Sequence, residues 1–230
     1  MVETQFEEMS MKLVLVADPM CSWCYGFGKE VTELRKAAPG LALEVVVGGL
    51  RPDETAVMPR HQRVARLEHW SRVEAASGLP FNRDAFIAND NLVYNTEPAC
   101  RAVVTARRLA PAVDQLAMLR AIQRAFYVDG RDITRGEVLA DVAASALSEL
   151  GFTTTPNDFL RAWQSPEAMD ETRGDFLRAR HWGISSFPSL LLEDGEKLYS
   201  VAPGYIDAKQ LISRVRTVAG SRVEVTTTAG

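Results

Sequence analysis

The chain has 230 residues, of which 47% are hydrophobic and 24% are charged, and its formal net charge at pH 7 is −4. This composition is typical of a globular protein with a substantial core, and the acidic balance argues against a general nucleic-acid binder. No segment contains the roughly 18 consecutive apolar residues that span a bilayer, and the acidic residues 1–10 lack the basic start of a secretory signal. We therefore expect a cytoplasmic protein without a membrane partner.

The first elements along the chain predict a strand–helix–strand unit. Residues 12–17 are mostly apolar and end at Asp18-Pro19, which is typical of a short buried strand. A helix is predicted over 22–38, because Pro39-Gly40 stops it, and a second buried strand is predicted over 41–47. This spacing favours two parallel strands joined by a crossover helix.

The middle of the chain, residues 53–182, shows helical patterns only. Several helix starts there are marked by capping residues and prolines. These starts occur at Asn95–Pro98, Thr155-Pro156 and Ser165-Pro166. The charged run from Arg60 to Arg66 is interpreted as a solvated helix face. We predict that this block is a helical subdomain packed on the sheet.

The strand pattern returns near the C-terminus. Residues 189–192 and 197–201 predict two strands joined at Asp194-Gly195, which is a strong hairpin turn. A closing helix is predicted over 207–219. The sequence therefore predicts an α/β fold, in which residues 1–52 and 183–230 form one domain and residues 53–182 form an all-helical insertion.

Two of the three cysteines lie where the first predicted strand leads into the first helix, at Cys21 and Cys24 of a Cys-Ser-Trp-Cys motif. The N-terminus of a helix stabilises a thiolate, and a thiolate rather than a thiol attacks disulfides. Cys24, one turn further along, is placed to resolve the resulting mixed disulfide. The motif therefore predicts thiol–disulfide exchange.

Zinc binding is the main alternative for a pair of cysteines with this spacing. Zinc needs two further nitrogen or sulfur ligands, and His61, His69 and His181 are scattered along the chain without ligand spacing. We expect no metal.

A distant proline is the second candidate feature. Pro188 precedes a predicted strand and follows Phe187, so the Phe187–Pro188 bond is a candidate cis peptide. Such a turn can bring the Phe187 backbone beside Cys21, where it can pair with an extended substrate. A trans proline that merely begins a strand is the alternative.

Three segments together resemble the DsbA-like thioredoxin family, and most closely its cytoplasmic branch of predicted protein-disulfide isomerases. These segments are Asp18–Phe27, Asn95–Arg101 and Ile184–Leu190. The resemblance implies a thioredoxin-like fold, a central mixed sheet flanked by helices with a large helical insertion. It also implies that Cys21 is the nucleophile, Cys24 the resolving thiol and Pro188 a cis-proline.

The resemblance further implies a thiol–disulfide oxidoreductase or protein-disulfide isomerase. Its partners would be disulfide- or thiol-bearing proteins or small molecules, without nucleic acid, and the oligomeric state is not predicted. No bound cofactor is expected beyond the redox-active Cys21–Cys24 disulfide, with glutathione as a possible reductant. Trp23, Tyr25 and Phe187 are candidate substrate contacts; a role in packing alone is an equal alternative for Trp23 and the favoured one for Tyr25.

Asp18 and Cys100 remain open to more than one interpretation. The family often places a buried acid six residues before the first cysteine, where this chain has Leu15. Asp18 is the nearest group for proton transfer, and the simpler hypothesis is that it caps the first helix. Cys100 is interpreted as a core residue, or alternatively as a third thiol that accepts the disulfide.

A second class of enzyme fits the same predicted architecture. The fold also resembles that of kappa-class glutathione transferases and 2-hydroxychromene-2-carboxylate isomerases, which typically have serine at the first motif position. Cys21 argues against this alternative, because its own sulfur would form a mixed disulfide with glutathione.

Overall fold

The computed structural model describes residues 11–226, so the acidic segment 1–10 that bears on a secretory signal lies outside the described residues. Its centre is a four-stranded mixed sheet in the order β2-β1-β3-β4. The strands are β1 (Lys12–Ala17), β2 (Ala42–Val47), β3 (Ser189–Asp194) and β4 (Lys197–Ala202). β1 is parallel to β2 and antiparallel to β3, which is antiparallel to β4. The predicted α/β class is confirmed.

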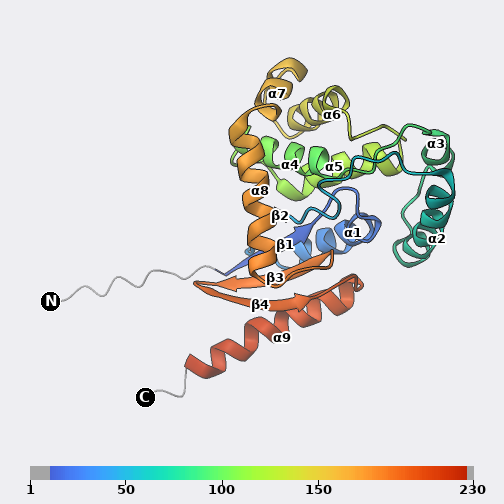
Figure 1. Ribbon diagram of the computed structural model, residues 1–230. Helices are drawn as coiled ribbons and strands as arrows, with labels where there is room; N and C mark the ends of the chain where they lie inside the picture. The colour runs from blue at the N-terminus through green and yellow to red at the C-terminus, as the bar shows by residue number, and fades with distance from the viewer. Residues whose placement is uncertain (1–10, 227–230) are drawn as a thin grey trace.

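Helices cover both faces of this sheet (Figure 1). Alternate residues of β1 point to opposite faces. Leu13 and Leu15 belong to the main core, together with residues of α1 (Ser22–Ala37) and α9 (Ala208–Thr226). Val14 and Val16 pack on the other face with Ala179 of α8 (Pro166–His181), in a smaller apolar cluster. The alternating faces explain why β1 is apolar along nearly its whole length.

The turn between β3 and β4 forms where the sequence predicts it. β3 and β4 form the predicted hairpin, in which Gly195 has a φ of 58°. A positive φ is adopted by glycine without the steric cost that a Cβ brings. The β3 strand extends to Asp194 and therefore runs two residues beyond the predicted strand.

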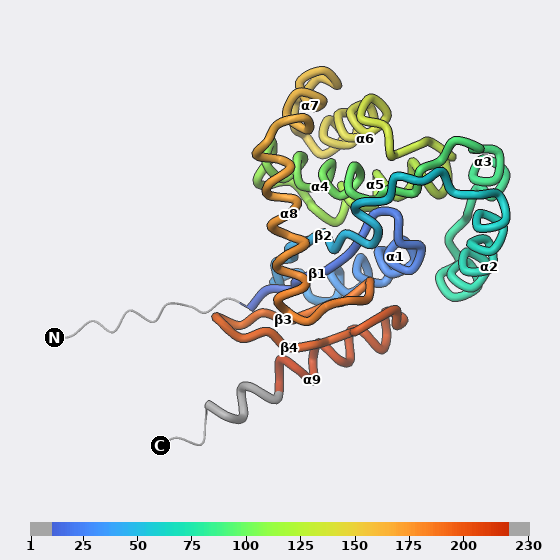
Figure 2. The backbone as a smooth tube through the Cα atoms, viewed as in Figure 1, coloured from blue at the N-terminus to red at the C-terminus, as the bar shows by residue number. Residues whose placement is uncertain are grey.

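Between β2 and β3 the chain leaves the sheet and returns only after a series of helices (Figure 2). These are α2 (Arg60–Ser77), α3 (Arg83–Ala88), α4 (Glu97–Leu109), α5 (Gln115–Tyr127), α6 (Gly136–Glu149), α7 (Pro156–Trp163) and α8 (Pro166–His181). Thr155 and Ser165 cap α7 and α8 through their hydroxyl oxygens, as their positions before proline predict. The main apolar core runs through both the sheet and these helices. The division of the chain at residues 53 and 182 stays a prediction.

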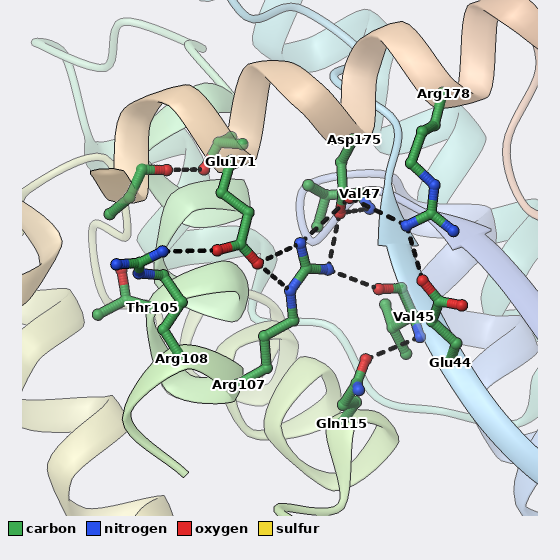
Figure 3. A network of polar contacts seen from close by, with 12 residues as sticks. Glu44, Val45, Val47, Thr105, Arg107, Arg108, Gln115, Glu171, Asp175 and Arg178 are labelled. Carbon is green, nitrogen blue, oxygen red and sulfur yellow. Dashed lines mark hydrogen bonds and ion pairs between the residues drawn. The ribbon is translucent and has the colours of Figure 1, made fainter. Parts of the chain in front are cut away.

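Side chains of the helices between β2 and β3 form hydrogen bonds with backbone groups on the free edge of β2 (Figure 3). The Gln115 side-chain oxygen accepts from the Val45 N–H at 2.9 Å, and Asp175 accepts from the Val47 N–H at 3.0 Å. Arg107 donates to the Val45 carbonyl oxygen at 3.1 Å and to Asp175 at 2.8 Å. An unpaired sheet edge is open to further strand pairing. Here the helices occupy that edge, and they thereby fix the end of β2 that faces the cysteine motif.

The described residues include no helix that is both long enough and apolar enough to cross a membrane.

Candidate redox site

Cys21 occupies the junction between β1 and α1. Its backbone is extended, with φ of −86° and ψ of 114°, and the residue stands at the N-cap position of α1. Its N–H donates to the Asp18 carbonyl oxygen at 3.1 Å, and its own carbonyl oxygen accepts from the Tyr25 N–H at 3.0 Å. The Cys21 side chain therefore projects from the positive end of the helix, where a thiolate is stabilised.

Cys24 lies one helical turn further along and is the more buried of the two thiols. Its exposed fraction is 2%, whereas that of Cys21 is 8%. Burial, followed by contact with Cys21, raises the pKa of Cys24 well above its usual range. In the described chain Cys21, Cys24 and Cys100 are all free thiols. The arrangement provides one thiol next to a pocket and a protonated second thiol behind it.

The Phe187–Pro188 segment lies against Cys21, as the sequence predicts. The Phe187–Pro188 peptide bond is cis, and the Cys21 thiol donates to the Phe187 carbonyl oxygen at 3.6 Å. The Phe187 ring packs on Gly48, just after β2, where an added Cβ would lie 2.1 Å from a ring carbon. Only glycine at position 48 allows this ring position, so the end of β2 and the proline segment are fitted to each other.

Asp18 is fully buried behind the motif. Its carboxylate accepts from the Met20 N–H at 2.8 Å and from the Leu50 N–H at 2.7 Å, and burial raises its pKa. The hypothesis that Asp18 caps the first helix is wrong, because no side chain caps α1 and these two amides precede or lie outside it. Instead, the Asp18 N–H points to the Cys24 sulfur at 3.5 Å. Asp18 thus contacts Cys24 through its backbone, and the charge of its carboxylate contributes to the raised pKa of Cys24.

Cys100, in the first turn of α4, contacts the same carboxylate. Its thiol donates to an Asp18 oxygen at 3.5 Å, and burial raises its pKa well above the usual range. Cys100 has no exposed surface, which favours its interpretation as a core residue.

We expect the Cys100→Ala protein to retain turnover of a disulfide substrate within about twofold, while its unfolding free energy falls by about 1 kcal/mol through loss of a packed side chain. Turnover assays and denaturant unfolding check both parts. A large loss of turnover, accompanied by a disulfide that includes Cys100 in mass spectra of the oxidised wild type, would instead support a third redox thiol.

A pocket of about 440 Å³ opens next to Cys21. Its wall combines the motif, the loop after β2 and one face of α2. The lining residues are Met20, Cys21, Ser22, Trp23, Leu50, Arg51, Gln62, Ala65, Arg66 and His69. Trp23 therefore reaches the pocket wall, although its ring also packs on Tyr205 at 5.3 Å between centroids. The α2 contribution has the three- and four-residue spacing of one helix face, a pattern from which the sequence could have indicated a shared surface.

The prediction that the charged run from Arg60 to Arg66 forms a solvated face of α2 is only partly correct. Arg63 has an exposed fraction of 2% and donates to the Met58 carbonyl oxygen at 2.8 Å. Arg66 is half-buried, with its guanidinium 4.1 Å from the centre of the Tyr94 ring. Residues three or four apart in a charged helical run share one face, and they can turn inward when an aromatic ring or a carbonyl oxygen contacts them.

Tyr25 takes a different place from the one predicted for a substrate contact. It is 7% exposed, stacks on Tyr127 at 4.7 Å between centroids, and donates to the Pro80 carbonyl oxygen at 3.2 Å. It is also absent from the wall of the pocket next to Cys21. Tyr25 therefore joins α1 to the helical block, and its packing role is the one that we retain.

The cysteine motif is accompanied by no candidate metal cluster in the part of the chain that the structure describes. No group of three or more His, Cys, Asp or Glu side chains is placed there to hold an ion.

These features define a class: a thioredoxin-like fold with a two-cysteine motif at the start of its first helix and a cis-proline segment beside it. The family model described as DSBA-like thioredoxin domain matches residues 12–216. The chain therefore belongs to the DsbA-like thioredoxin family of thiol–disulfide oxidoreductases.

Two solved structures are similar over nearly their full length. The first, described as a "putative protein disulfide isomerase from Nitrosomonas europaea", is 31% identical with a TM-score of 0.80, and covers 92% of this chain and 98% of that one. The second is the cytosolic disulfide reductase DsbM from Pseudomonas aeruginosa, which is 26% identical with a TM-score of 0.72. The match covers 92% of this chain and 99% of the DsbM chain. A further DsbM structure is described as being with GSH.

A 2-hydroxychromene-2-carboxylate isomerase structure is similar in fold alone, at 12% identity and a TM-score of 0.56. No curated protein matches the chain.

Proposed function

We propose that the protein reduces or rearranges disulfides through Cys21 and Cys24. The observation that carries the proposal is the position of the Cys21 sulfur, which lies at the N-terminus of α1, next to a pocket, and 3.6 Å from the carbonyl oxygen of Phe187. An attacking thiol needs a partly exposed position and a site that stabilises its thiolate. The cis-proline segment adds a backbone surface beside the sulfur, on which an extended substrate can pair as a strand.

The exchange takes two steps with balanced electrons. The Cys21 thiolate attacks one sulfur of the substrate disulfide, the substrate S–S bond breaks, and the other substrate sulfur leaves as a thiolate. Cys24 then loses its proton and attacks the Cys21 sulfur. This step releases the second substrate thiol and leaves a Cys21–Cys24 disulfide. In an isomerisation, a second substrate thiolate attacks the substrate sulfur of the mixed disulfide. A new substrate S–S bond forms, the bond to Cys21 breaks, and Cys21 leaves as a thiolate, so the protein ends reduced.

Asp18 is our candidate for the group that receives the Cys24 proton. Its backbone N–H contacts the Cys24 sulfur at 3.5 Å, and burial raises the pKa of both side chains. A buried carboxyl group with a raised pKa has more affinity for a proton than an exposed one, so the proton transfer from Cys24 costs less than a transfer to an ordinary carboxylate.

We propose the cytoplasm as the place of action and glutathione as the reductant. Two molecules of glutathione supply the electrons that reduce the Cys21–Cys24 disulfide, and they leave as glutathione disulfide. The similarity to DsbM supports this choice, because that relative is cytosolic and reductive and one of its structures is with GSH. The transferase or isomerase alternative rests on fold similarity alone, and a cysteine at position 21 favours exchange.

In the Cys21→Ser protein, the rates at which insulin and small disulfides are reduced should fall to background, because the serine hydroxyl does not attack a disulfide at neutral pH. The reduction potential of the Cys21–Cys24 pair against glutathione, measured on the wild type, determines the direction of electron flow. Turnover that survives in Cys21→Ser would exclude the proposed chemistry, and a pair that glutathione leaves oxidised would exclude glutathione as the reductant.

A further inference from the structure

The pocket next to Cys21 has an unusual balance of charge for an acidic protein. The chain carries a net charge of −4. Among the described residues that line the pocket, however, Arg51 and Arg66 are cationic, Gln62 and His69 are polar, and none carries a carboxylate. The pocket is therefore a local positive site next to the candidate nucleophile. Such a site raises the local concentration of anions and selects for negative charge on a ligand.

Arg66 is the cation in this wall without a carboxylate partner. Arg63, on the same helix, pairs with Asp90, and Arg51 lies 3.6 Å from Glu54. The described residues provide no such partner for Arg66, whose guanidinium instead lies 4.1 Å from the centre of the Tyr94 ring. A guanidinium stacked on an aromatic face keeps its N–H groups directed outward at its edges, where they fit both oxygens of a carboxylate.

The Tyr94 ring also links Arg66 to the cysteine motif. Tyr94 is fully buried, and its hydroxyl donates to the carbonyl oxygen of Met20, the residue before Cys21. The position of the guanidinium is therefore set relative to the nucleophile by a single rigid ring. A fixed cation loses little conformational freedom when an anion binds, which increases its contribution to recognition.

We propose that Arg66 forms a carboxylate-binding subsite that makes the pocket selective for thiols and disulfides bearing a carboxylate close to the sulfur. The proposal rests on the exchange function proposed above and specifies its substrate class. The substrate carboxylate pairs with Arg66, and the exposed Arg51 is a second cation in the same wall, while the substrate sulfur contacts Cys21. Neutral disulfides enter the same pocket without this contact, and cationic disulfides are repelled.

The test uses the full-length reduced protein and three small disulfides that differ in charge. These are 3,3′-dithiodipropionate, 2-hydroxyethyl disulfide and cystamine, which are a dianion, a neutral molecule and a dication. Because no external reductant is present, the second-order rate constant for oxidation of the Cys21–Cys24 pair is followed directly. The fluorescence of Trp23 in the motif provides one signal, and alkylation of the remaining thiols followed by mass measurement provides another.

The Arg66→Met protein should react about tenfold more slowly than the wild type with the dianion, the loss expected for one charge-assisted contact. Its rate with the neutral disulfide should stay within about twofold, and its rate with the dication should rise. Arg66→Lys should keep most of the wild-type rate with the dianion. Arg60→Met removes an exposed charge on the same helix that does not line the pocket, and it should change none of the three rates appreciably.

The outcomes separate the two proposals. Equal slowing of all three reactions in Arg66→Met would assign Arg66 a structural role through Tyr94 and overturn the subsite, as would rates that do not change. Two other results would contradict the exchange function itself. One is a wild-type protein that reacts with none of the three disulfides, and the other is a Cys21→Ser protein that reacts as fast as the wild type.

Discussion

The Cys24→Ser protein is expected to accumulate a mixed disulfide between Cys21 and its substrate, and to lose steady-state turnover by about two orders of magnitude or more. Cys21 remains able to attack in this variant, but the group that releases the substrate is absent. Incubation with a small disulfide, followed by mass measurement of the intact protein, should show one adduct per chain. A peptide map should place that adduct on Cys21.

The pH dependence of adduct release provides the control. Because burial and contact with Cys21 raise the pKa of Cys24, its thiolate fraction grows about tenfold per pH unit below that pKa. The wild-type adduct should therefore resolve faster as the pH rises, whereas the Cys24→Ser adduct should show no such acceleration. If the two adducts decay alike at every pH, Cys24 is not the resolving thiol and the order of the two cysteines in the mechanism must be revised.

The placement of the motif could be predicted from the sequence because it is local. The three-residue separation of Cys21 and Cys24 places them one helical turn apart once a strand leads into a helix, and both elements have clear patterns. The position of Phe187 beside Cys21 is a non-local feature. A proline before a strand makes it a candidate, and the resemblance to a family turns that candidate into a prediction. The physical basis of this position includes the absence of a side chain at Gly48, and nothing in the sequence around Gly48 indicates which ring packs on it.

The walls of the pocket could not be predicted in the same way. Arg66 was assigned to a solvated face because its neighbours are charged, and its stacking on Tyr94 depends on how α2 lies against the segment before α4. Asp18 was assigned to helix capping for a similar reason, since an aspartate shortly before a helix usually serves that purpose. Its carboxylate instead accepts from the Leu50 N–H, in a loop 32 residues away. In both cases, tertiary contacts determined the role of a side chain whose local pattern suggested another.

Replacing Asp175 with alanine should lower the unfolding free energy by about 3–5 kcal/mol, the range for breaking a buried ion pair by removing one partner. Asp175 is 2% exposed and accepts two hydrogen bonds from Arg107, at 2.8 and 3.1 Å, as well as one from the Val47 N–H (Figure 3). Without it, the Val47 amide loses its acceptor, and the largely buried Arg107 guanidinium loses one of its two carboxylate partners and keeps Glu171 at 2.8 Å. Denaturant unfolding gives the free energy, and amide exchange at Val47 should become faster.

Two further variants show whether the loss arises from the broken Arg107–Asp175 pair. Combining Asp175→Ala with Arg107→Met should cost less than the sum of the two single changes, because each single change already breaks this pair. Asp170 pairs with Arg173 on the exposed side of α8, so Asp170→Ala removes a carboxylate from the same helix and should leave stability nearly unchanged. Additive losses in the double variant would mean that Asp175 stabilises β2 mainly through the Val47 amide. In that case, the edge of the sheet next to Gly48, and with it the position of Phe187 over that glycine, would depend on one carboxylate rather than on the ion pair.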